Sequence, residues 1–83
     1  MGKYRKVIDK ILRGTSDANI AFEDIRGVLL HLGFDERIRG SHHLYRMEGI
    51  EEKINLQHSG NKAKPYQVKQ VRDILLKYHL TGE

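Results

Sequence analysis

Two adjacent histidines are the side chains of this 83-residue chain best suited to chemistry. His42 and His43 follow a Gly-Ser dipeptide, at what the sequence pattern indicates is the start of a β-strand. A histidine titrates near neutral pH, so its imidazole can take or give a proton during catalysis. Successive side chains of a strand point to opposite faces, so one of these two histidines should be covered and the other exposed.

The residues that follow leave two orientations open. If Tyr45 faces the core, His43 shares its side. In that case His42 lies on the open face with Leu44 and Arg46. If Leu44 faces the core instead, the two histidines exchange roles.

Basic and small residues around the histidines could bind an anionic ligand. Arginine forms bidentate hydrogen bonds with phosphate, and glycine lets a ligand backbone approach closely. The lysines that flank the start of the last predicted helix lie where free N–H groups and the helix dipole favour phosphate. The candidate contacts with a phosphate-containing ligand are Arg39, Gly40, Ser41, Arg46, His58, Lys62, Lys64 and Lys69.

The spacing of the five histidines does not favour a metal site. His42 and His43 diverge on a strand, no His-x-x-x-His pair occurs on a predicted helix, and the chain has no cysteine. It also lacks a glycine-rich nucleotide loop and a nucleophile elbow. We therefore expect neither a metal nor another cofactor.

Composition indicates a single small domain with a moderately basic surface. The formal net charge is +4 and the isoelectric point is about 9.5, which suits a polyanionic partner. The absence of cysteine is compatible with a reducing cytoplasm. No apolar run has the length of a signal peptide core or a membrane span, so we expect a cytoplasmic protein without a membrane partner.

The periodicity of apolar residues predicts helices and strands in a definite order. Apolar positions three or four apart predict helices at residues 4–12, at 22–32 and from Pro65 onward. Alternating positions predict strands at 34–39, 41–47 and 52–56. A hairpin-type turn is expected at 48–50, and the polar segment 58–64 is expected to be a loop.

This order predicts an α+β fold of the double-stranded-RNA-binding-domain type. Two helices cover one face of a three-stranded antiparallel sheet and leave the other face open. Residues 21–83 would form this domain, and residues 1–20 would add an N-terminal helix and a loop. The apolar stripe of the first helix indicates that it packs against the domain or a partner.

From Phe22 to Leu80 the chain resembles the HicA family of toxins from toxin–antitoxin modules. The resemblance rests on four segments in the same order as the predicted elements. They are Leu32-Gly33-Phe34, Gly40-Ser41-His42-His43, Ile54-Asn55-Leu56-Gln57-His58, and Lys64-Pro65 before a helix that contains Ile74-Leu75. The chain departs from the family pattern in two places. Residues 1–20 lie outside the pattern, and the third strand has Leu56-Gln57-His58 where a proline often precedes a basic residue and the histidine.

The resemblance implies a ribonuclease that cleaves mRNA and is neutralised by a HicB-like antitoxin. The family's catalytic histidine lies in the Gly-Ser-His block, which corresponds here to His42, and some relatives use the next position, His43. Such cleavage needs a base for the 2′-hydroxyl proton, an acid for the leaving oxygen, and cations for the charged transition state. The oligomeric state and the stoichiometry with an antitoxin are not specified by these residues.

Two other functions are compatible with the same pattern. A non-catalytic RNA-binding module would use Lys62, Lys64 and Lys69 on successive phosphates, and its affinity would fall with salt. An interaction domain would use the basic face to bind an acidic protein.

Overall fold

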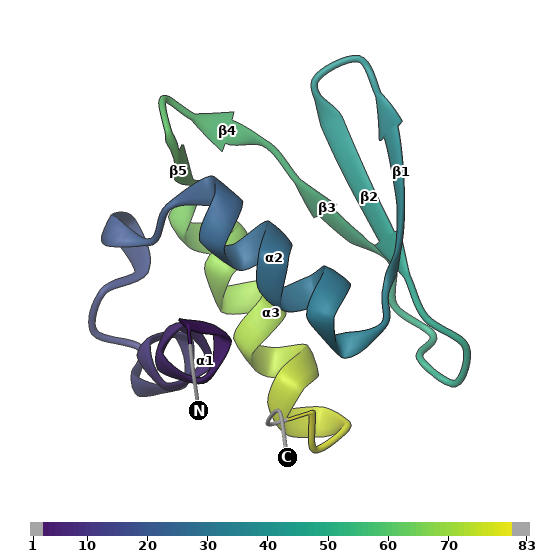
Figure 1. Cartoon of the computed structure of the whole chain (residues 1–83), viewed down its shortest axis with the longest axis horizontal. Helices are drawn as coiled ribbons and strands as arrows, with labels where there is room; N and C mark the ends of the chain where they lie inside the picture. Colours follow the sequence, from purple (N-terminus) through teal and green to yellow (C-terminus); the bar gives the residue numbers. More distant parts are fainter. Residues whose placement is uncertain (1–2, 81–83) are drawn as a thin grey trace.

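The computed structural model describes residues 3–80, which form an α+β domain (Figure 1). The helices are α1 (Lys3–Arg13), α2 (Phe22–Leu32) and α3 (Pro65–Lys77), with a 3-10 turn, η1 (Asp17–Asn19), before α2. The strands are β1 (Asp35–Arg39), β2 (His42–Arg46), β3 (Ile54–Leu56), β4 (His58–Ser59) and β5 (Lys62–Ala63). The predicted α+β class is confirmed, and the second helix has its predicted bounds.

The main sheet is antiparallel, with strand order β1-β2-β3. In its register Tyr45 lies between Glu36 of β1 and Ile54 of β3. Tyr45 and Ile54 are buried, and the helices lie on their side of the sheet (Figure 1). We call the face that carries Tyr45 the inner face. The opposite face, on which no helix of residues 3–80 packs, is called the open face.

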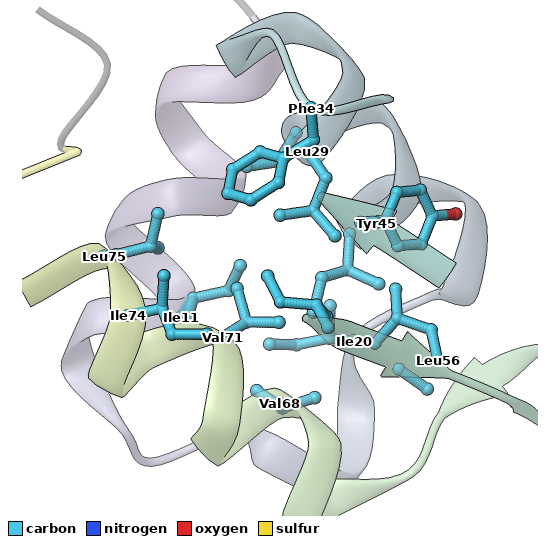
Figure 2. Close-up of a cluster of buried hydrophobic side chains, with 14 of the residues drawn as sticks. Ile11, Ile20, Leu29, Phe34, Tyr45, Leu56, Val68, Val71, Ile74 and Leu75 are labelled. Carbon is cyan, nitrogen blue, oxygen red and sulfur yellow. The ribbon is translucent and has the colours of Figure 1, made fainter. Parts of the chain in front are cut away.

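One hydrophobic core joins the helices to the inner face (Figure 2). Side chains from α1, α2, α3 and the strands β2, β3 and β5 meet in it, and most are fully buried. Among them are Ile11, Phe22, Ile25, Leu29, Tyr45, Ile54, Leu56, Val68, Val71 and Leu75. The Tyr45 ring lies at the margin of this cluster, with its hydroxyl directed outward (Figure 2).

None of the helices within residues 3–80 combines the length and apolarity needed to cross a membrane.

Helix α1 packs on α2 and α3, as its apolar stripe predicts. Val7, Ile8 and Ile11 are buried in the same core as the residues of the other helices. Gly27 of α2 permits this approach, because a Cβ there would lie 2.7 Å from the ring of Tyr4. Residues 1–2 and 81–83, at the outer ends of the two predicted segments, lie outside the described residues.

The predicted loop at 58–64 is wrong, because this segment forms the β4–β5 hairpin. The hairpin turns at Gly60, whose φ is +66°. It is held on the segment before α2 by backbone hydrogen bonds from Phe22 N–H to Asn61 C=O (3.0 Å) and from Ala63 N–H to Ile20 C=O (3.0 Å). These contacts with a distant segment stabilise strands that have no apolar alternation of their own.

The connection between β2 and β3 is longer than the predicted hairpin turn. A turn does occur, since Ile50 N–H donates to Met47 C=O at 3.1 Å and Gly49 has a φ of +90°. The strands, however, are separated by residues 47–53, and β3 begins only at Ile54. Ile50 is buried, so this connection contributes a side chain to the core.

We predict that Ile11→Ala will destabilise the protein strongly. The Ile11 side chain is fully buried where α1 packs against the rest of the core. Truncation to alanine therefore removes buried apolar surface and leaves a cavity. The expected loss in the free energy of unfolding is roughly 2–5 kcal/mol, measured by urea denaturation. The control is Lys6→Ala on the exposed side of α1, which should change stability by less than about 0.5 kcal/mol. Equal stabilities for the two variants would show that α1 does not contribute to the core.

Candidate functional site

The β1–β2 hairpin places the paired histidines at one end of the sheet. Gly40 and Ser41 form a two-residue turn between Arg39 and His42, which are directly paired. Gly40 has a φ of +59°, as expected for the first central residue of a type II′ turn. A two-residue turn is closed by a hydrogen-bonded pair, so the Cα atoms of Arg39 and His42 should lie about 5.5 Å apart. Their side chains are therefore neighbours on the open face.

His42 is exposed on the open face and is held by Asn55 of β3. The Nδ1 atom of His42 lies 3.3 Å from Oδ1 of Asn55. An amide oxygen only accepts, so in this contact Nδ1–H is the donor. Nε2 is then the nitrogen that can take a proton from a ligand.

Four cations share the open face with His42. Arg37 and Arg39 lie on β1, Arg46 ends β2, and Lys53 precedes β3. All four line a concavity, together with Asp35, Leu44 and Glu36. None of the four forms an ion pair with an acidic side chain among residues 3–80. The open face therefore has uncompensated positive charge beside an exposed imidazole.

The inner face holds a partly buried polar network around Glu36. Its carboxylate accepts hydrogen bonds from Arg26 Nη2 (3.0 Å) and from the hydroxyl of Tyr45 (2.6 Å). The bonds from Arg26 hold the pKa of Glu36 at about 2, against an ordinary value of 4.5, although burial acts in the opposite direction. Burial and the hydrogen bond to Glu36 raise the pKa of Tyr45 above its usual range. Through these hydrogen bonds Glu36 of β1 connects Arg26 of α2 with Tyr45 of β2.

His43 faces this network and not the open face. Only 14% of its side chain is exposed, and its ring packs edge-on against Phe22 with 4.8 Å between centroids. Its Nδ1 lies 3.7 Å from Oε2 of Glu36 and has no hydrogen-bond partner among residues 3–80. The first of the two orientations considered from the sequence is therefore observed, since Tyr45 faces the core and His42 does not.

His58 lies on the side of the helices, away from His42. Its ring stacks on Phe22 at 3.7 Å between centroids and lies 5.8 Å from the ring of His43. His58 is nevertheless exposed. Within residues 3–80, no three His, Asp or Glu side chains lie close enough together to hold a metal ion.

The three lysines proposed from the sequence do not share the open face with His42. Lys62 is exposed on β5. Lys64 precedes α3, and its Nζ donates to Oε1 of Gln57 at 3.4 Å. Lys69 forms an exposed ion pair with Asp73, one turn further along α3, at 3.2 Å.

The structure thus brings together part of the sequence-based site. His42, Arg39 and Arg46 lie on the open face, with Gly40 and Ser41 at its end, whereas His58 and the lysines lie elsewhere. Sequence reasoning missed Arg37, Lys53 and Asn55. Arg37 and Arg39 are two residues apart, and so are Lys53 and Asn55. This spacing was a signal, because residues two apart in a strand share one face.

Comparisons with models of protein families, with curated proteins and with solved structures found no match to this chain.

We predict that Glu36→Gln will flatten the fall of stability in acid. A carboxylate whose pKa is lowered by folding stabilises the folded state above its unfolded pKa, near 4.5, and loses that contribution as pH falls toward 2. The variant should be destabilised at neutral pH by roughly 1.5–3 kcal/mol, because Arg26 and Tyr45 lose a charged partner. The measurement is the urea midpoint as a function of pH.

The matched control is Glu48→Gln, an exposed carboxyl without an ion-pair partner in the described part of the chain. It should retain both the stability and the pH dependence of the unmodified protein. Glu52, whose pKa is also held at about 2 by Lys77 and Tyr78, remains in both variants, so some acid sensitivity should persist. An unchanged pH dependence in Glu36→Gln would contradict the role given to this network.

Proposed function

We propose that this protein is a metal-independent endoribonuclease that uses His42 as its acid–base residue on the open face. The observation that carries this proposal is the position of His42. It is exposed, its Nδ1 is held by Asn55, and it is the direct cross-strand neighbour of Arg39. An oriented imidazole beside a guanidinium supplies both proton transfer and charge stabilisation to a phosphodiester.

The reaction follows from these groups and the RNA itself. Nε2 of His42 takes the proton of a 2′-hydroxyl, whose oxygen then attacks the adjacent phosphorus. The bond from phosphorus to the 5′-oxygen breaks, and the leaving oxygen takes a proton from water. Arg39 stabilises the negative charge that builds up on the nonbridging oxygens. Arg37, Arg46 and Lys53 bind neighbouring phosphates along the open face.

The resemblance to HicA toxins supports this chemistry and suggests a biological setting. The Gly-Ser-His-His block of the resemblance is the turn and strand that present His42. The structure has the order α2-β1-β2-β3, then the β4–β5 hairpin, then α3, with the helices on one side of the main sheet. Apart from the added hairpin, this order is compatible with the double-stranded-RNA-binding-domain-like fold that we propose. In this proposal the protein is the toxin of a toxin–antitoxin module, cleaves mRNA in the cytoplasm, and is neutralised by a HicB-like antitoxin.

We predict that His42→Ala will remove most of the RNA cleavage in the presence of EDTA. Loss of a general acid–base residue costs a factor of roughly 10² to 10⁴ in rate. The substrate is a long single-stranded RNA, and the products should carry the 2′,3′-cyclic phosphate that attack by the 2′-hydroxyl leaves. Circular dichroism and urea denaturation establish that the variant is folded, as expected for an exposed side chain.

Two other histidine variants make this test specific. His31→Ala, on an exposed part of α2, should cleave at the rate of the unmodified protein. His43→Ala should lose stability because its ring packs on Phe22, and its residual folded fraction should still cleave. Loss of cleavage in folded His43→Ala alone would move the catalytic role to His43. Binding of RNA without cleavage by the unmodified protein would favour the non-catalytic module.

We predict that Asn55→Ala will slow cleavage less than His42→Ala does. The variant keeps the imidazole and loses the hydrogen bond that orients it, which is worth roughly 2- to 10-fold in rate. Asn55→Asp should recover much of the loss, because a carboxylate oxygen also accepts from Nδ1–H. Asn61→Ala on the exposed β4–β5 turn is the control and should have no effect on the rate. Equal rates for Asn55→Ala and the unmodified protein would show that this contact does not position His42.

A further inference from the structure

Strand β1 is an edge of the sheet, and no other strand of residues 3–80 pairs with its outer side. It pairs with β2 at every residue from Asp35 to Arg39, without a bulge or a proline. Because the two-residue turn makes Arg39 and His42 a hydrogen-bonded pair, the hydrogen-bonded positions of β1 are its odd-numbered residues. The N–H and C=O groups of Glu36 and Ile38 therefore point outward from the sheet. No hydrogen bond within residues 3–80 occupies them.

The side chains of this edge are apolar on one face and basic on the other. Ile38 is 53% exposed, although it is paired with His43 and so belongs to the inner face. Arg37 and Arg39 flank it in sequence and lie on the open face. An extended polypeptide added to β1 would place one side chain next to Ile38 and its two flanking side chains next to the arginines.

We infer that β1 is the docking site of an extended acidic segment of a partner protein, which adds to the sheet as a fourth strand. The outward backbone groups and the exposed Ile38 require a polypeptide, because an RNA strand offers no ladder of N–H and C=O groups. The unpaired charges of Arg37 and Arg39, beside Arg46 and Lys53, select acidic side chains. The segment that fits has an apolar residue between two acidic ones.

The same charges disfavour pairing of β1 with a second copy of this chain. Joining two β1 edges would bring the arginines of both copies onto one face, where like charges close to one another are destabilising. An acidic strand has the opposite effect, since it neutralises the cations of the open face. Its acidic side chains would then compete with phosphates beside His42. This inhibitory consequence rests on the proposed function, whereas the docking itself does not.

The test uses the full chain and a short synthetic peptide in which glutamate alternates with valine and both ends are blocked. Exchange of backbone amide hydrogens is followed residue by residue by NMR. The amides of Glu36 and Ile38, which point outward, should exchange about 10-fold more slowly when the peptide is at about ten times its Kd. The amides of Arg37 and Arg39, which are already paired with β2, serve as internal controls and should change little.

Two matched controls separate strand addition from simple charge attraction. The same peptide with N-methyl groups on alternate backbone nitrogens cannot donate to the edge and should give no protection. The second control is the double variant Arg37→Glu and Arg39→Glu, checked for folding by circular dichroism. The glutamate peptide should no longer slow amide exchange at Glu36 and Ile38 in this variant. A peptide in which lysine alternates with valine should slow it instead. Rescue by reversed charge would identify these two positions as the electrostatic contacts.

Several outcomes would overturn the inference. They are the absence of binding, binding without protection of Glu36 and Ile38, and equal binding of the N-methylated peptide. Equal protection of these two amides by a non-cleavable 2′-O-methyl RNA would assign the edge to nucleic acid. RNA cleavage measured in parallel should be inhibited by the glutamate peptide. A protein that shows the protection and no cleavage would refute the proposed function and leave the docking site standing.

Discussion

The alternation of side chains along β2 constrains the rest of this structure. Tyr45 is fully buried between Glu36 and Ile54, so the inner face is defined by this residue and its neighbours across the sheet. The period of two then directs His43 inward and His42 outward. A shift of the strand by one residue would expose Tyr45 and bury His42, so the register that stabilises the core also presents the imidazole.

The two faces of the sheet consequently differ in how their charges are paired. On the inner face, charge is compensated, since Glu36 is bound by Arg26 and Tyr45, and burial there contributes to stability. On the open face, the cations have no acidic partners within residues 3–80. Their mutual repulsion destabilises the folded state and favours the binding of an anionic ligand. The edge strand β1 contributes side chains to both faces, and its outward backbone groups form the docking site that we propose for an acidic polypeptide.

The helices were predictable because each buries one apolar stripe, and the helix at Phe22–Leu32 was predicted with its observed bounds. The β4–β5 hairpin was not, because its strands are short and polar and are stabilised by backbone contacts with Ile20 and Phe22. Strand alternation alone allowed two orientations for the histidines, and the burial of Tyr45 decides between them. The contact between His42 and Asn55 depends on the register in which β2 pairs with β3. Residue patterns predicted that these strands pair, but they do not reveal this register.

We propose that RNA binds on the open face beside His42, and NMR mapping with a non-cleavable 2′-O-methyl RNA is the measurement that tests this position of the RNA. Resonances are followed for the whole chain while the RNA is added at low salt, where phosphate contacts are strongest. The account predicts changes at His42 and Asn55 and at the side chains of Arg37, Arg39 and Arg46. Changes confined to the β4–β5 hairpin and the start of α3, around Lys62 and Lys64, would contradict it.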